Sequence, residues 1–404
     1  MNSSLRLRLA RLAGFEPATG CLEGSCSVLL SYRRRVCNFA RPRSRGCNGA
    51  DEPWSHSRAG AARRRRGLPI VLSVTATVGR SRPAEPHRRS PGWPVAAGIL
   101  AGAAADALLG DPRRGHPVAL FGRAAQAVQS RAYADSRVRG AGYAAGCLLA
   151  AAAPAVAAER LTRGRPLLRV AATAAAVWTA TGGRSLAREA ERIAAALQAG
   201  DLEAARAALP NLCGRDPSQL GDRELARAVV ESVAENTSDA IVAPVLWCAL
   251  AGLPGAAGYR AVNTLDAMVG YRSPRYARFG WGAARLDDVA NWAPSRLTGL
   301  LTVAVSPVVG GSPAVTWRTL RRDGGRHPSP NAGRCEAAFA GALGVRLGGT
   351  NDYAGETEHR PVLGGGRAAG PADIRRAVRL CRAVTIAATA VSVVAAAAIG
   401  TGRP

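Results

Sequence analysis

Carboxylate and amide side chains recur at helical spacing in the stretch 224–296. Glu231 and Glu235 are four residues apart, so they share one face of a helix, and Asp239 continues that face by one turn. The chain then enters the run 240–259, which holds no charged residue. Carboxylates that border an apolar segment are costly to hold there and indicate a functional site. The alternative interpretation is that these side chains cap helices and solvate loops.

Three clusters of this kind supply candidate catalytic and metal-binding groups. A carboxylate can act as a general acid or base. The candidate catalytic residues are Glu231, Glu235, Asn236, Asp239, Asn263 and Asp266. Hard oxygen ligands also suit Mg²⁺, which bridges carboxylates to phosphate. The candidate metal ligands are Asp287, Asp288 and Asn291, for which a polar helix with capping acids is the alternative.

Candidate substrate-binding and phosphate-binding residues are spread over the chain after residue 110. The motif GDPRRGHPV, 110–118, places an acid and a histidine in a polar loop, and Arg suits bidentate binding of phosphate. In SPNAG, 329–333, Asn331 is expected to cap a helix whose exposed amides favour anions. The set is Asp111, His116, Arg215, Arg296, Asn331, Glu336 and Arg346. Ordinary turns and a plain helix cap are the alternatives.

The composition excludes two common catalytic devices. All 54 basic residues are Arg, so a phosphate-binding loop ending in Gly-Lys and a lysine Schiff base are both excluded. The formal net charge of +26 would ordinarily suggest nucleic acid. However, residues 1–93 alone hold 18 Arg against 5 acids. A basic membrane protein beside anionic lipid explains the remainder, so we expect no nucleic-acid partner. A soluble Arg-rich nucleic-acid binder is the alternative class.

The chain divides into a disordered Arg-rich extension, 1–93, and a membrane-embedded domain, 94–404. The extension shows no sustained hydrophobic period, and a mis-assigned start is favoured over a basic arm. The second segment holds apolar runs at 94–110, 141–158, 167–183, 240–259, 297–311 and 383–400. Because about 20 apolar residues span a bilayer, these runs predict an all-α, polytopic integral membrane protein with cytoplasmic helical loops. A soluble all-helical protein is the alternative.

Three segments carry more specific structural expectations. The run 240–259 contains Pro244 and Pro254, and the run 297–311 has only 15 residues. We expect both to be broken or re-entrant and to line one cavity, since irregular backbone at membrane depth is tolerated only where protein or water covers it. The charged segment 185–208 instead predicts an amphipathic helix pair interrupted at Gly200.

Four motifs resemble a known family. They are GDPRRGHPVALFGR, VVESVAENTSDAIVAPVLW, YRAVNTLDAMVGYRSPRYARFGWGAARLDDVANWAPSRLT and SPNAGRCEAAFAGALGVRLGGTNDY. In this order, over about residues 94–400, they resemble the membrane-bound adenosylcobinamide-phosphate synthase family of cobalamin biosynthesis, also written CobD/CbiB. The resemblance implies a multi-pass protein of the cell membrane whose motif loops face the cytoplasm.

The family's reaction implies the substrates and cofactors. It joins the carboxylate of adenosylcobyric acid, a corrinoid, to (R)-1-amino-2-propanol phosphate or threonine phosphate, forming an amide with ATP and Mg²⁺. The implied partners are these small molecules and membrane lipid, and a complex with other enzymes of cobalamin biosynthesis is left open. The alternative function is a membrane transporter of a corrinoid or another anionic small molecule. A transporter would show paired repeats in its two halves, and none is detectable here.

Overall fold

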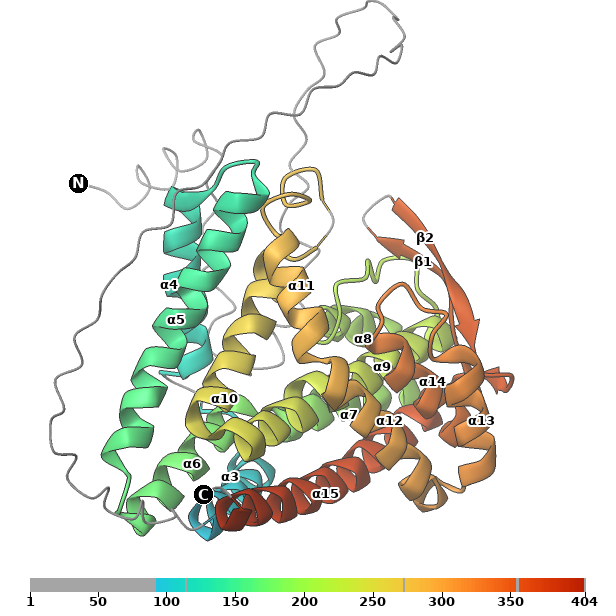
Figure 1. Cartoon of the computed structure of the whole chain (residues 1–404). Coiled ribbons are helices and arrows are strands. Elements are labelled where there is room, and N and C mark those ends of the chain that lie inside the picture. Colours follow the sequence, from blue (N-terminus) through green and yellow to red (C-terminus); the bar gives the residue numbers. More distant parts are fainter. Residues whose placement is uncertain (1–91, 113–114, 272, 354–355, 403–404) are drawn as a thin grey trace, which may run out of the picture. The chain divides into compact units, whose positions relative to one another are not determined.

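A computed structural model describes residues 92–112, 115–271, 273–353 and 356–402 (Figure 1). The prediction for the Arg-rich extension therefore falls almost wholly outside the described residues. The helices are α3 (Trp93–Leu109), α4 (Pro117–Ala132), α5 (Arg137–Leu161), α6 (Pro166–Ala180), α7 (Gly183–Gln198), α8 (Leu202–Ala208), η1 (Leu209–Asn211), α9 (Asp222–Thr237), η2 (Ser238–Val242), α10 (Ala243–Val269), α11 (Trp281–Ala290), α12 (Trp292–Val305), η3 (Ser306–Val309), α13 (Pro313–Asp323), α14 (Ala332–Leu343) and α15 (Pro371–Gly402).

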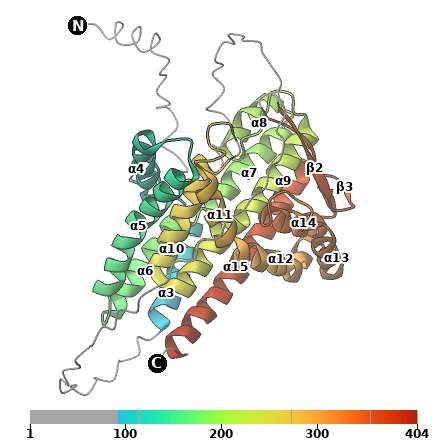
Figure 2. The ribbon, with the colours of Figure 1, turned by 45° about the horizontal axis from the view of Figure 1, so that its top comes forward.

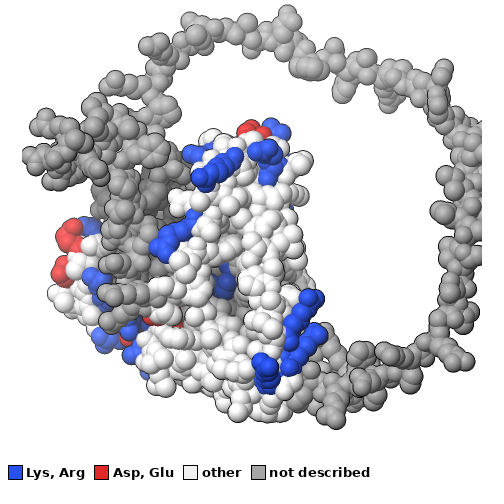
Figure 3. Space-filling view, turned by 90° about the vertical axis from the view of Figure 1, so that its left-hand side faces the viewer, with Lys and Arg blue, Asp and Glu red and all other residues white. Residues whose placement is uncertain are grey.

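Three helical segments are long and apolar enough to cross a membrane, which confirms the all-α membrane fold. They are Arg137–Leu161, Asp222–Val269 and Pro371–Ile399. The first has Arg residues in its opening turn and Arg160 in its last. Figure 3 views the side on which α4, α5 and α6 lie and shows a broad area without charge, with Arg side chains gathered at both ends. This pattern suits an apolar span whose ends reach the headgroup regions.

Small residues bring α3 and α6 into close contact. A Cβ added at Gly98 would lie 2.4 Å from the Cβ of Thr173, and one at Gly102 would lie 2.6 Å from the Cβ of Val177. The pair forms a Gly-x-x-x-Gly spacing, which lets apolar helices approach closely. Figure 2 shows α3 and α6 beside α5, α10 and α15, and an apolar cluster that includes Ile99 joins α3 to its neighbours.

The candidate span Asp222–Val269 is broken inside, as expected for the run 240–259. Gly252 has φ 66°, and Pro254 follows two residues later. The amide N–H of Leu253 donates to Oε2 of Glu159 at 2.9 Å, so the new helix segment receives a cap from α5. Arg169 forms an ion pair with the other oxygen of this carboxylate. The chain turns here, as Figure 1 shows, so α9 and the end of α10 are not one straight helix.

The second run expected to be broken also stops short of a full span. Helix α12 has 14 residues, whereas about 20 are needed to cross the hydrocarbon core. It ends in the 3₁₀ turn η3, which contains Pro307. Gly310 follows with φ 73°, and α13 begins at Pro313. The helix therefore ends where the proline and the left-handed glycine remove helical hydrogen bonding.

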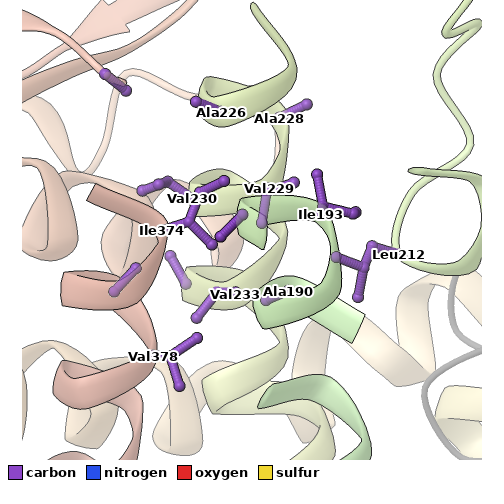
Figure 4. Close-up of a cluster of buried hydrophobic side chains, with 14 of the residues drawn as sticks. Ala190, Ile193, Leu212, Ala226, Ala228, Val229, Val230, Val233, Ile374 and Val378 are labelled. Carbon is purple, nitrogen blue, oxygen red and sulfur yellow. The ribbon is translucent and has the colours of Figure 1, made fainter. Parts of the chain in front are cut away.

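A second apolar core joins α7, α9 and the beginning of α15 (Figure 4). Ile193 of α7, Val229 and Val233 of α9, and Val378 of α15 are fully buried or nearly so. The predicted helix pair is confirmed, because α7 ends at Gln198 and α8 starts at Leu202. Asp201 caps α8 by accepting from the amide of Ala204 at 2.9 Å.

A small sheet was not predicted from the sequence. It has the order β2-β1-β3, where β1 is Val345–Tyr353, β2 is Glu356–Leu363 and β3 is Arg367–Ala368. Strands β1 and β2 are antiparallel, with Leu347 opposite Leu363, and β1 and β3 are parallel. The register shifts between Leu347 and Gly349, where two glycines adopt positive φ. Glycine pairs interrupt strand periodicity, which is why the sequence pattern missed this sheet.

Candidate functional site

Most of the predicted site residues gather, together with residues that were not predicted, into two neighbouring groups around α9 and η2. We call the first the glutamate group; it comprises Arg215, Glu231, Glu235, His327, Glu336 and Arg360. We call the second the aspartate group; it comprises Asp111, His116, Asp239, Tyr259, Arg260, Asn263, Asp287 and Asn291. Asp239 lies in the π-helical turn η2, a local form that is frequent at functional sites.

Glu231 is held on both oxygens within the glutamate group. One oxygen forms an ion pair with Arg215, and both side chains are almost completely buried, with exposed fractions of 5% and 6%. The other oxygen accepts from the amide N–H of Gly348 at 2.7 Å. Gly348 has positive φ and lies at the register shift in β1, and this conformation directs its amide N–H toward the Glu231 carboxylate. Arg227 lies nearer in sequence, yet it donates to the carbonyls of Gly348 and Thr350 and so binds α9 to β1.

His327 and Glu336 form a second buried pair in the glutamate group. Nε2 of His327 lies 3.7 Å from Oε1 of Glu336, and the two side chains are 6% and 2% exposed. Burial lowers the pKa of His327. Burial raises the pKa of Glu336 well above its usual value, and the nearby Glu231 and Glu235 raise it further. His327 was not among the predicted residues, although it stands two positions before the SPNAG motif.

The aspartate group assembles around the buried guanidinium of Arg260. Asp111, Asp239 and Asp287 lie within electrostatic range of Arg260, which is 4% exposed. Nη1 of Arg260 donates to Oδ1 of Asn263 at 3.3 Å. Because a buried charge is tolerated only when it is paired and hydrogen-bonded, these acids explain why Arg260 can be inside. Arg260 itself was not predicted, since it stands directly after a long uncharged run.

Amides and a tyrosine complete the aspartate group. Nδ2 of Asn263 lies 3.4 Å from Oδ1 of Asp287. The hydroxyl of Tyr259 donates to Oδ1 of Asn291 at 2.9 Å and lies 3.0 Å from the carbonyl oxygen of Asp239. These contacts join α10, α11 and η2, so residues separated by about fifty positions meet at one place.

His116 brings the 110–118 motif to the same group. It occupies the N-cap position of α4, and its Nδ1 accepts from the amide of Val118 at 3.2 Å. Burial lowers the pKa of His116, Asp111 opposes this change, and Arg260 lowers the pKa further. The neutral ring then carries its hydrogen on Nε2, which is buried and forms no hydrogen bond with any residue that the structure describes. This is a donor ready for a ligand oxygen.

The two groups are adjacent because both draw on α9 and η2. Glu235, Asp239 and Glu336 all lie within electrostatic range of the buried thiol of Cys335 on α14. Nδ2 of Asn331 donates to the backbone oxygen of Asp288 at 2.8 Å, which links the α13–α14 loop to α11. The three acids predicted to share one helical face therefore divide between the two groups. Glu231 and Glu235 of α9 belong to the glutamate group, and Asp239 of η2 belongs to the aspartate group.

The remaining candidates have partners of their own. Asn331 occupies the N-cap position of α14, but the prediction that its side chain caps the helix is wrong. Its amide binds Asp288 instead, and Oγ of Ser329 accepts from the amide of Ala332 at 3.2 Å. Arg296 stacks on the ring of Trp292 at 4.2 Å. Its Nη1 also lies 3.4 Å from Oδ1 of Asn331, at the edge of the α13–α14 loop.

The last three candidates are Asn236, Asp266 and Arg346. Asn236 is buried in α9, where its amide donates to the carbonyl of Ser232 at 2.8 Å. The Asp266 carboxylate covers Gly270, since a Cβ there would be 1.7 Å from Oδ1 of Asp266. Arg346 is exposed on β1 and lines a cleft of about 240 Å³ with Gly348 and Gly349.

Two of the three predicted metal ligands, Asp287 and Asn291, belong to the aspartate group, where they contact Asn263 and Tyr259. Oδ2 of the third, Asp288, lies 3.5 Å from Nη1 of Arg285. Within the described part of the chain, no three His, Cys, Asp or Glu side chains are arranged to hold a metal ion by themselves. Mg²⁺ usually takes only one or two carboxylates and completes its shell with water and substrate phosphate. The carboxylate and amide oxygens of the aspartate group fit that requirement.

Comparisons with known proteins agree with the four motifs. A family model described as CobD/Cbib protein matches residues 99–381. The Cobalamin biosynthesis protein CobD of Mycobacterium tuberculosis (strain CDC 1551 / Oshkosh) is 56% identical over 298 residues, covering 74% of this chain and 95% of that protein. The proteins of the same name from Geobacter metallireducens and Chromobacterium violaceum are each 43% identical, covering 66% and 73% of this chain and 85% and 95% of their own lengths. No solved structure matches this chain.

Proposed function

This chain belongs to the CobD/Cbib family, and on that premise we propose that it is an enzyme of cobalamin biosynthesis. The reaction we propose is ATP-dependent formation of an amide between adenosylcobyric acid and (R)-1-amino-2-propanol phosphate or threonine phosphate. The protein would act at the cell membrane, with lipid around its apolar helices and the motif loops on the cytoplasmic side. A complex with other enzymes of the same pathway is compatible with this placement.

The chemistry of amide formation defines what the site must supply. A carboxylate is a poor electrophile, so it is first activated as an acyl phosphate at the expense of ATP. Asp239 and Asp287 are the residues that would hold Mg²⁺, with Asp111 beside them. Bound there, Mg²⁺ would neutralise charge on the nucleotide phosphates. Arg260 and Nε2 of His116 would orient the phosphate oxygens. A carboxylate of the site would take a proton from the amine.

The observation that supports this function best is the assembly of the aspartate group. Four segments that are distant in sequence place acids, an amide and a histidine around a buried Arg260. Apolar residues of matching volume would often stabilise a fold as well as such buried charges do. A polar centre of this size between apolar helices is therefore expected where charged substrates react.

One observation supports transport as a second candidate. Helix α10 is broken at Gly252, and transporters use broken helices at their binding sites. The break, however, is capped by Glu159 of α5 and lies away from the aspartate group along α10. Transport therefore remains the weaker candidate.

The direct test supplies the purified protein in lipid nanodiscs with adenosylcobyric acid, ATP, Mg²⁺ and either aminopropanol phosphate or threonine phosphate. The expected result is an amide product of the matching mass and ADP in equal amount. The variant Glu235→Gln keeps the side-chain shape and should lower the rate at least about a hundredfold, because it removes a negative charge that positions the amine. A folded wild-type protein that yields no amide with either amine would overturn the proposed function and favour transport.

A further inference from the structure

The geometry points to Glu336 as the general base that takes the proton from the amine substrate, with His327 as the residue that positions it. This inference rests on the proposed function and assigns the amine half-reaction to the glutamate group. The substrate class is a small molecule that carries both a primary ammonium and a phosphate.

The Glu336 carboxyl has an oxygen without a partner among the described residues. Its side chain is 2% exposed, Oε1 faces Nε2 of His327 at 3.7 Å, and Oε2 is buried and forms no hydrogen bond within that part of the chain. A buried polar atom without a partner is costly, so such atoms in native proteins call for an explanation. A substrate N–H that approaches Oε2 would satisfy it. Burial also raises the pKa of Glu336, which makes its carboxylate a stronger proton acceptor.

His327 is arranged to orient this carboxyl. Its Nδ1 accepts from the amide N–H of Ser329 at 3.0 Å, so the neutral ring carries its hydrogen on Nε2. That hydrogen is on the side of Glu336, at an Nε2–Oε1 distance of 3.7 Å that is longer than a hydrogen bond, and Nε2 forms no hydrogen bond within the described part of the chain. A base held by a third group is the usual arrangement in acid–base sites. His327 therefore acts through Glu336 and not on the substrate.

The surrounding charges suit a phosphorylated amine. Glu231 is already bound by Arg215 and by the amide of Gly348, so it is not available as a base. Glu235 and Arg360 are only half-buried, and both lie within electrostatic range of His327 and Glu336. Glu231, Glu235 and Glu336 bring three carboxyl groups within electrostatic range of one another. That concentration of acid suits an ammonium group, while Arg360 suits the phosphate of the same molecule.

The proton balance of the step can be written in full. The ammonium gives one proton to Glu336, and the nitrogen lone pair then attacks the carbonyl carbon of the acyl phosphate. The bond between that carbon and the phosphate oxygen breaks, and the electron pair leaves with phosphate. The nitrogen loses a second proton to the departing phosphate, which leaves the neutral amide. Glu336 then returns its proton to solvent past the half-buried Glu235.

The test compares two nucleophiles on the same activated carboxylate. Hydroxylamine is largely unprotonated at neutral pH, so it attacks an acyl phosphate without a general base. Glu336→Gln should lower amide formation with aminopropanol phosphate at least about a hundredfold, while hydroxamate formation stays within about threefold of wild type. The matched control is Glu203→Gln, an exposed acid of α8 that should change neither product.

His327→Asn provides a second, independent measurement. It should lower amide formation, leave hydroxamate formation unchanged and shift the pH profile of the amide reaction alone, because the carboxyl loses its orienting donor. Equal loss of both products in folded Glu336→Gln, or an unchanged ratio of the two products in both variants, would overturn the assignment. Absence of both products in the wild type would instead refute the proposed ligase function.

Discussion

Removal of Arg215 should destabilise the protein severely, because it leaves the buried carboxylate of Glu231 without its ion partner. Both side chains are almost fully buried, and breaking a buried pair by removing one partner costs about 3–5 kcal/mol. After Arg215→Met, the amide of Gly348 still donates to Glu231. The expected loss in unfolding free energy for Arg215→Met is therefore about 3–5 kcal/mol.

The double variant Arg215→Met/Glu231→Leu should lose less than the single variant. It removes both charges together, and an apolar replacement of a buried pair is often neutral. What is left is the unpaired amide of Gly348, which costs about 1–3 kcal/mol. Thermal unfolding in detergent, followed by circular dichroism at 222 nm, measures the difference between the two variants.

The matched control is an exposed ion pair on the same fold. Arg382 and Glu191 lie 2.8 Å apart between α15 and α7, but their side chains are 59% and 44% exposed. Arg382→Met should cost about 1 kcal/mol or less, because water screens such pairs. The reasoning fails if Arg215→Met is no worse than Arg382→Met, or if the double variant is less stable than the single variant.

Three other predictions follow from the same structure. The variant Asp239→Asn should fold normally but lower amide formation at least about a hundredfold. Near-normal turnover would show that Asp239 is only a solvated helix residue. Gly252→Ala should lower the unfolding temperature, since φ is 66° and the new Cβ would lie 2.3 Å from a carboxylate oxygen of α5, whereas Gly258→Ala, whose Cβ would lie at an ordinary 3.6 Å from Cδ1 of Leu148, should not. Cysteines placed at Ser218 and at Ser273 should react with an impermeant thiol reagent from the same side of the membrane, and opposite accessibility would exclude a shared cavity.

Apolar runs and proline positions were sufficient to predict the helices and their interruptions. Runs of small apolar residues predicted the long helices, and Pro254 predicted the break in α10, which falls at Gly252, because proline does not continue a helix readily. Gly200 and Asp201 likewise marked the end of α7 and the beginning of α8. These features depend on local backbone preference and on periodicity, which the amino-acid order contains directly.

The partners within the site depended on the tertiary structure. Spacing along α9 suggested that Glu231 and Asp239 act together. In the folded protein, Glu231 forms an ion pair with Arg215, and Asp239 lies within electrostatic range of Arg260. His327 comes next to Glu336 only because the α13–α14 loop folds over α14. The packing of whole helices against one another determines which charged side chains lie close together. The free energy of that packing comes from many small apolar contacts, so no single sequence motif contains it. The sequence by itself therefore determined which residues could react, while the three-dimensional packing decided which of them face each other.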